Sequence, residues 1–215
     1  MCLVGAGNIA QTHADVLLSL EGVTVSAVVD TNISAARALA DRFHGARAFT
    51  TTDEALAAGN FQRAHVLVPP ALHEDIVATL LRAGISVWGE KPLAATHEGC
   101  EKLVSLAKKH EAVLGTNQNY LFSPAFRELA ALVRTNALGS LRHVSCIFSM
   151  PLRQLTAKQM SHWMFDKPGN LLLEQAIHPL SLIRALLGDV TRITATSSSA
   201  STVSPCAPPP QSSQH

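Results

Sequence analysis

The chain has 215 residues, of which 47% are hydrophobic and 15% are charged, and its formal net charge is +1. This length fits one large domain or two small ones, and the apolar fraction is sufficient for a buried core. A nearly neutral chain is not expected to bind nucleic acid or another polyanion. No apolar stretch reaches the roughly 18 residues that a membrane span requires, and the N-terminus has no signal-peptide pattern.

The cysteines stand far apart along the chain, at Cys2, Cys100, Cys146 and Cys206. No pair has the CxxC spacing of a zinc site, and no framework of disulfides is indicated. We therefore expect no metal, and free thiols in a reducing compartment, which favours the cytoplasm.

The first 116 residues alternate between short apolar runs and segments with helical periodicity. The apolar runs, which we predict to be strands, cover residues 2–4, 23–29, 64–68, 85–88 and 112–115. Helices are predicted over 71–83 and over 96–110, where Thr96 can serve as N-cap. Apolar strands that alternate with helices predict an α/β domain, a doubly wound parallel sheet with both faces covered.

After residue 116 the pattern changes to that of a second, differently built α+β region. We predict helices over 123–134 and 170–187 and strands over 140–150 and 190–196. Ser123 can cap the first of these helices, and Pro179 is expected to kink or divide the second. Residues 197–215 are rich in Ser and Pro and contain no charged side chain, so we expect them to be disordered.

A glycine motif, Gly5-x-Gly7-x-x-Ala10, follows the first strand directly and opens a helix. Gly5 permits a tight turn, Gly7 lets the backbone approach a pyrophosphate, and Ala10 lets the helix pack closely on the sheet. The phosphates would lie on the N-terminus of that helix, beside Asn8 and Ile9. The motif is weak alone, but in this strand–turn–helix context it predicts a dinucleotide site, with a glycine-rich turn that binds nothing as the alternative.

Asp30 ends the second apolar run, at the distance from the glycine motif where dinucleotide-binding proteins hold the ribose. A carboxylate there accepts hydrogen bonds from both ribose hydroxyls and repels a 2′-phosphate. The expected cofactor is therefore NAD, with NADP left open because the preference depends on Asp30 alone.

The sequence Glu90-Lys91-Pro92 follows the apolar run 85–88. Ligands of open α/β sheets bind at the carboxyl ends of the strands, so Lys91 is predicted to face the nicotinamide end of the cofactor. Its ammonium group could polarise a substrate oxygen or take part in proton transfer, and Pro92 restricts its backbone. The alternative is an exposed Glu–Lys pair in a loop, which usually contributes little.

Five segments together resemble the Gfo/Idh/MocA family of NAD(P)-dependent oxidoreductases, over roughly residues 1–195. In chain order they read GAGNIAQTHA, VVD, VPPALH, GEKPLA and EQAIHPL. The resemblance implies a Rossmann domain, here residues 1–118, and a second domain that carries substrate and oligomer contacts, here a partial one at 119–196. It also implies a small sugar or polyol substrate, such as a cyclitol.

The resemblance carries functional residues onto this chain. It places Lys91 in the catalytic set and makes His178 the general acid/base. Glu174 stands where the family has Asp, and a spacing of four places Glu174 and His178 on one helix face, where a carboxylate can orient an imidazole.

Other family positions fall near the cofactor. Val68 and Pro69 would lie beside it, with His73 in the helix that follows. From the residues alone, a histidine that packs in the protein or lies on the helix surface is the favoured reading of His73. Asn119 in the segment after the last strand would reach cofactor or substrate, as would Asn117. Glu90 would contact the cofactor or support a residue that does.

Two departures from the family pattern leave the activity open. Glu174 is one methylene longer than the usual Asp, and Ser181 stands where many members have a further Asp. Family members also continue well past this length, so the chain is expected to be C-terminally truncated. The readings are an NAD(P)-dependent oxidoreductase, a non-catalytic NAD(P)-binding regulator, or an inactive truncated member.

Overall fold

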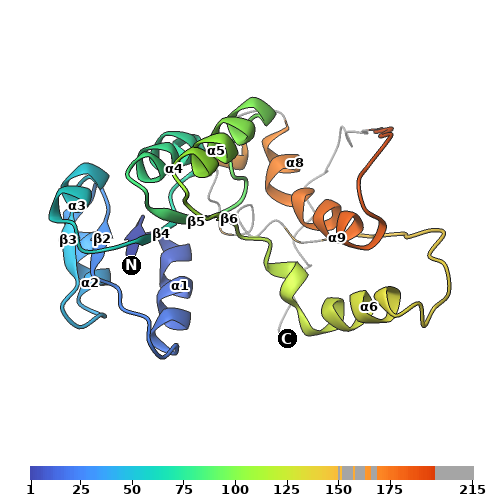
Figure 1. Ribbon diagram of the computed structural model, residues 1–215, viewed down its shortest axis with the longest axis horizontal. Helices are drawn as coiled ribbons and strands as arrows, with labels where there is room; N and C mark the ends of the chain where they lie inside the picture. Colours follow the sequence, from blue (N-terminus) through green and yellow to red (C-terminus); the bar gives the residue numbers. More distant parts are fainter. Residues whose placement is uncertain (150, 152–156, 158–162, 166–168, 197–215) are drawn as a thin grey trace, which may run out of the picture.

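The computed structural model describes residues 1–149, 151, 157, 163–165 and 169–196. The tail at 197–215, predicted to be disordered, lies outside these residues. Figure 1 shows the sheet and the helices α1 to α5 at one end of the molecule and α6, α8 and α9 at the other. Within the described ranges, no helix combines the length and apolar character needed to cross a bilayer.

Six parallel strands form one sheet with the order β3-β2-β1-β4-β5-β6. They are β1 (Cys2–Val4), β2 (Ala27–Val29), β3 (Arg47–Phe49), β4 (Arg63–Val66), β5 (Ser86–Gly89) and β6 (Leu114–Thr116). The order reverses between β1 and β4, and this switch point is where doubly wound sheets bind their ligands. The predicted parallel sheet is therefore confirmed.

Strand β3 is absent from the prediction because it is short and stands at the edge of the sheet. It pairs only with β2, and its pattern is exposed or half-buried rather than apolar. The Arg47 guanidinium lies over the Phe49 ring, 5.1 Å from its centroid. A three-residue edge strand with a charged first residue gives no apolar run to detect.

Five helices cover the two faces of the sheet. They are α1 (Asn8–Leu18), α2 (Ile33–Ala40), α3 (Thr52–Ala58), α4 (His73–Arg82) and α5 (His97–Lys109). Thr96 caps α5 as predicted, since its side chain accepts a hydrogen bond from the Gly99 N–H. The short 3₁₀ turn η1 (Pro70–Leu72) forms the start of the segment predicted as one helix over 71–83.

The core consists of two layers, one on each face of the sheet. Cys2 and Val4 of β1 pack with buried residues of α3, α4 and α5, whereas Leu3 packs with buried residues of α1 and α2. Side chains alternate between faces along a strand, so β1 and β2 contribute to both layers. This arrangement explains why the strands read as continuous apolar runs.

The second region is helical where the structure describes it. It contains α6 (Pro124–Arg134), α8 (Asn170–Gln175), α9 (Ile177–Leu187) and the 3₁₀ turns η2 (Asn119–Phe122) and η3 (Trp163–Phe165). Ser123 caps α6 as predicted, through a hydrogen bond from the Phe126 N–H. The segment 170–187 is divided at Ala176, and Pro179 lies in the first turn of α9, where its missing N–H has no helical partner to lose.

The two strands predicted in this region are wrong. Residues 140–149 and 190–196 form no strand. Ile147 is 92% exposed and Ile193 is 74% exposed, so neither segment has the covered face that its pattern suggested. A strand also needs a hydrogen-bonded neighbour, and the described part of this region provides none.

Gly5→Ala is expected to lower the free energy of unfolding by more than about 2 kcal/mol. Gly5 has a φ of +101°, and a Cβ there would lie 2.6 Å from the Leu67 carbonyl oxygen. Urea denaturation measures the loss. Gly7→Ala is the matched control, because Gly7 has a φ of −74° and no atom within 4 Å of an added Cβ. The control should lose no more than about 1 kcal/mol, and equal losses in the two variants would contradict the explanation.

Candidate cofactor and catalytic site

The turn between β1 and α1 has the geometry of a phosphate cradle. The Gly5 N–H donates to the Val29 carbonyl at 2.8 Å, which bends the chain across the end of β2. Gly7 is the N-cap of α1, with no side-chain cap and no acidic residue in the first turn. The open space beside Gly7 and the free first-turn N–H groups fit a pyrophosphate. Asn8 and Ile9 lie exposed in this first turn.

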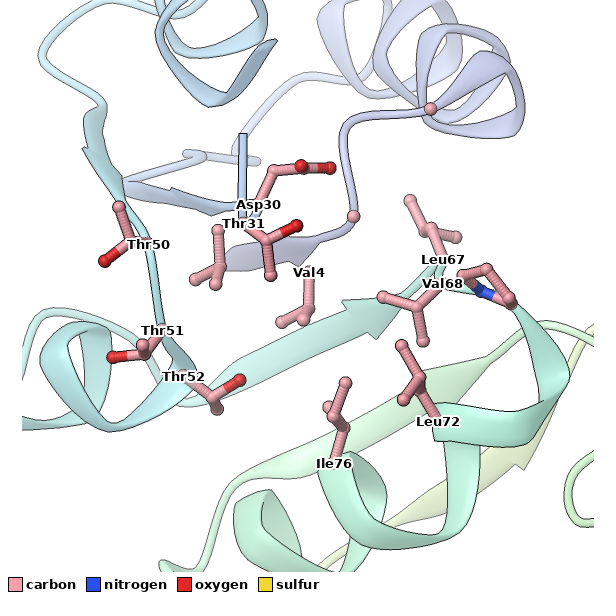
Figure 2. A pocket seen from close by; sticks show the side chains of 14 residues that line it. Val4, Asp30, Thr31, Thr50, Thr51, Thr52, Leu67, Val68, Leu72 and Ile76 are labelled. Atoms are coloured by element: carbon pink, nitrogen blue, oxygen red, sulfur yellow. The ribbon is translucent and has the colours of Figure 1, made fainter. Parts of the chain in front are cut away.

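A pocket of about 350 Å³ opens beside this turn, at the carboxyl ends of the strands. Figure 2 shows Asp30 and Thr31 on one side of it and Leu67, Val68, Leu72 and Ile76 on another. Of the residues that the sequence assigned to the cofactor, the structure brings five together here: Gly5, Gly7, Asp30, Val68 and Pro69. Largely apolar walls with a carboxylate at one end suit a nucleoside.

Asp30 is held in place by backbone donors. One carboxylate oxygen accepts the Ala6 N–H at 2.8 Å and the other accepts the Asn32 N–H at 2.8 Å. A carboxylate has about four lone-pair positions, so both oxygens can accept further hydrogen bonds. The Ala6 contact joins Asp30 to the glycine turn, so the positions that the sequence predicts for ribose and phosphate are fixed to each other.

Sequence reasoning missed one wall of the pocket, formed by the consecutive threonines Thr50, Thr51 and Thr52. They follow β3, the strand that the prediction lacked. Had that strand been recognised, its carboxyl end would have placed these hydroxyls at the same edge as Asp30. Thr51 caps α3 with a capping box that includes Glu54.

Lys91 leaves the carboxyl end of β5 and contacts the second region. Its Nζ lies 2.8 Å from Glu174 Oε1 and donates to the Glu174 carbonyl at 3.1 Å. The Lys91 and Glu174 side chains are 14% and 16% exposed, so this ion pair is largely shielded from water. The Lys91–Pro92 peptide bond is cis. The alternative of an exposed loop pair is wrong, because the partner of Lys91 is Glu174 and both are mostly buried.

His178 is buried in α9, with 9% of its surface exposed. Its ring lies 4.7 Å from that of Tyr120 and 6.2 Å from that of Phe148, measured between centroids. Burial, and next the charge of Lys91, lower the pKa of His178 below its ordinary value, against the opposing effect of Glu174. Its Nδ1 has no hydrogen-bond partner in the described part of the chain.

The expectation that Glu174 and His178 share one continuous helix is wrong. Glu174 belongs to α8 and His178 to α9, with the break at Ala176 between them. The Glu174 carboxylate pairs with Lys91 instead, and the His178 Nδ1 accepts no support from it. The break changes the role that geometry gives Glu174, from orienting the imidazole to holding the ammonium group.

His73 lies inside the protein rather than at the pocket surface. It is 1% exposed, with Nδ1 2.6 Å from the Pro92 carbonyl oxygen and Nε2 2.8 Å from the Val68 carbonyl oxygen. It therefore joins the segment after β4 to the segment after β5 and does not line the cofactor pocket. Asn119 is exposed at the start of η2.

Glu90 is surrounded by donors from its own chain. Its Oε1 is 3.1 Å from His13 Nε2 and accepts the Asn117 Nδ2 hydrogen bond at 2.6 Å, and its Oε2 accepts the Lys91 N–H at 3.3 Å. Burial alone would raise the pKa of Glu90, but the hydrogen bonds from His13 and Asn117 outweigh it and lower the pKa. Glu90 thus supports Lys91. Its partner His13 was not identified as a site residue from the sequence.

Comparisons with known proteins agree with this geometry. Residues 1–118 match the family model described as an oxidoreductase family with an NAD-binding Rossmann fold, and residues 126–207 match that of the GFO/IDH/MocA C-terminal domain. A crystal structure of GenD2 from gentamicin A biosynthesis, in complex with NAD, is similar with a TM-score of 0.70 and 30% identity, over 87% of this chain and 53% of that one.

Two curated relatives show the range of named activities. The chain is 31% identical to a dTDP-3,4-didehydro-2,6-dideoxy-alpha-D-glucose 3-reductase from Streptomyces violaceoruber, over 78% of this chain and 48% of that protein. It is 30% identical to an inositol 2-dehydrogenase from Corynebacterium glutamicum, over 65% of this chain and 42% of that protein. The chain thus spans about half the length of the curated relatives it matches. With a family model matched over more than half its length, the chain belongs to the Gfo/Idh/MocA oxidoreductase family.

Proposed function

We propose that the protein is an NAD-dependent oxidoreductase that transfers hydride between the nicotinamide ring and a hydroxyl or carbonyl group of a sugar or polyol. The observation that carries the proposal is the contact of Lys91 with Glu174, because it brings a shielded ammonium group from the end of β5 against the second region. The relatives named as a sugar reductase and an inositol dehydrogenase support this substrate class.

In the oxidative direction, His178 removes the proton of the substrate hydroxyl. Its lowered pKa keeps the imidazole neutral near pH 7, and a neutral imidazole can act as a general base. Lys91 donates to the same oxygen and stabilises the negative charge that develops there. The bound nicotinamide supplies the hydride acceptor, the carbon–oxygen bond becomes a carbonyl, and His178 keeps the proton.

Glu174 and Glu90 hold Lys91 in this mechanism. The Glu174 carboxylate neutralises the ammonium group and fixes its direction, while Glu90 binds the Lys91 backbone N–H. Held in this way, the lysine loses little conformational freedom when substrate binds.

The free thiols of Cys2 and Cys100 support a reducing location, the cytoplasm, for this reaction.

Asp30→Asn is expected to reduce the preference for NAD over NADP by about tenfold or more, because the neutral amide no longer repels a 2′-phosphate. The amide oxygen still accepts one of the two backbone N–H groups, so the fold should persist. Calorimetric titration with each dinucleotide measures the ratio. Asp189→Asn is the control, since Asp189 is a 90% exposed carboxylate that pairs only with Arg184 among the ion pairs described. An unchanged ratio in Asp30→Asn would remove Asp30 as the selectivity residue.

Lys91→Met and His178→Gln are each expected to lower kcat by roughly 10²- to 10⁴-fold on any polyol that the wild type oxidises, with NADH binding retained. NADH absorbance on a panel that includes myo-inositol provides the assay. For the wild type, the acidic limb of the kcat/KM profile should lie below pH 6.5, since burial and Lys91 lower the pKa of His178 from 6.5.

Three outcomes would count against this proposal. Full activity in both variants would overturn the mechanism. Tight NAD binding by the wild type without turnover on any substrate would favour a non-catalytic regulator, whereas the absence of both would mark the chain as an inactive member.

A further inference from the structure

Behind Glu90 lie two histidines, His13 and His65, that the proposed mechanism does not use. His13 in α1 has Nδ1 3.1 Å from His65 Nδ1 in β4 and Nε2 3.1 Å from Glu90 Oε1 after β5. The His13 and Glu90 side chains are each 12% exposed. The two imidazole rings meet edge to face, with an interplanar angle of 84°.

The sheet register explains why these residues meet. His65 pairs with Leu3 of β1, whose side chain belongs to the core layer beneath α1 and α2. Its neighbours Ala64 and Val66 belong to the opposite layer, so alternation along β4 directs His65 toward α1. A polar side chain at the centre of the sheet needs a partner there, and His13 provides it.

The proton positions follow from the partners. The lowered pKa of Glu90 makes it a carboxylate, which only accepts, so His13 Nε2 carries a proton. In neutral His13, Nδ1 is then an acceptor, and His65 Nδ1 must donate to it. Burial, and next the charge on His13, lower the pKa of His65 to about 4, so His65 is neutral near pH 7 and is held as its Nδ1–H tautomer.

Protonation of His13 reverses the direction of its hydrogen bond with His65 and leaves its hydrogen bond to Glu90 unchanged. Charged His13 donates from both nitrogens, and neutral His65 can meet it by moving its proton to Nε2 and accepting at Nδ1. His13 thus keeps both contacts in either charge state, and Glu90 keeps its donor. Three charges act on His65. The charge on His13 and the α-amino group of Met1 lower the pKa of His65, whereas Glu90 raises it.

Glu90 connects His13 to the residues at the carboxyl edge of the sheet. Its backbone N–H donates to the Val66 carbonyl at 2.9 Å, and its carboxylate binds the Lys91 N–H and the Asn117 amide. Asn117 in turn donates its N–H to the Gly89 carbonyl at 2.8 Å. Glu90 therefore joins the ends of three strands where Lys91 leaves the sheet: its backbone N–H contacts β4, and its carboxylate contacts the residues that follow β5 and β6.

We propose that His13 and His65 are positioning residues, a two-histidine relay that holds the Glu90 carboxylate against the backbone of Lys91 whichever charge His13 carries. The link to Lys91 as a catalytic residue rests on the proposed function. The relay itself does not, so the two can fail separately.

The first test is nitrogen NMR of the full chain labelled with ¹⁵N-histidine. At about pH 8 the His13 ring is expected as the Nε2–H tautomer and the His65 ring as the Nδ1–H tautomer. In molecules whose His13 ring is protonated, the His65 ring is expected as the neutral Nε2–H tautomer. An Nε2–H tautomer of His65 at high pH, the form usual for a free imidazole, would overturn the proposal. A His65 tautomer that stays the same whether His13 is neutral or charged would also overturn it.

The second test measures the Glu90 carboxyl by ¹³C NMR in His13→Phe and His13→Gln. Removal of the His13 donor should raise the pKa of Glu90, which means that its acid dissociation constant falls by about tenfold or more. Burial raises this pKa, and without His13 fewer hydrogen bonds stabilise the carboxylate against it. The Gln side chain can donate to Glu90 and should restore most of the shift. His97→Phe is the control, since the His97 side chain is 80% exposed. An unchanged Glu90 titration in a folded His13→Phe chain would refute the relay.

Where turnover is found, His13→Phe should lower kcat severalfold more than it changes KM, with rescue in His13→Gln. If His13 had a purely structural role, His13→Phe and His13→Gln would lose kcat equally, in proportion to the fall in their unfolding midpoints. That result would overturn the positioning claim. If no substrate is turned over, the proposed function fails, while the NMR measurements still decide the relay.

Discussion

A backbone contact across the switch point of the sheet sets the geometry of the whole site. The turn after β1 passes so close to the end of β4 that a side chain at Gly5 would meet the Leu67 carbonyl at 2.6 Å. Hydrogen bonds from Gly5 to Val29 and from Leu67 to Val4 hold the three chain segments together. Because all strands run parallel, every strand ends at this same edge, and the cofactor pocket, Asp30 and Lys91 all lie there.

Around this edge, the polar groups divide into two sets with different tasks. One set lines the pocket and is partly open: Asp30 retains acceptor positions, and the first turn of α1 retains free N–H groups. The other set is turned inward and fully engaged: His73 joins two loops, and Glu90 is bound by His13, Asn117 and Lys91. The inward set joins chain segments that surround the pocket: His73 links the residues after β4 and β5, and Glu90 links α1 to the residues after β5 and β6.

The parallel sheet, which the sequence predicted correctly, was carried by local pattern. Gly5, Gly7 and Asp30 could be placed at one edge of that sheet because each lies at or just after a strand end, and the structure brings them to one pocket. The Lys91–Glu174 ion pair joins residues that are 83 positions apart, so no local pattern in the sequence indicates it.

The errors also have physical causes. Residues 140–150, which partly alternate in polarity, and 190–196 were predicted to be strands, but the pattern of one segment does not show whether a partner strand lies beside it. His13 and His65 each read as an isolated histidine, since only the register of β4 against β1 and the helix above it brings them together.

The ammonium group of a lysine has three N–H donors, and its contact with Glu174 engages the side-chain oxygen and the carbonyl of the same residue. Among the contacts described, one donor of Lys91 is left to point elsewhere. A single donor recognises one oxygen at a time and does not distinguish neighbouring hydroxyls on a ring. Under the proposed function, regiochemistry on a polyhydroxylated ligand must then come from how the surrounding walls present that ligand, while the lysine contacts only the oxygen that reacts.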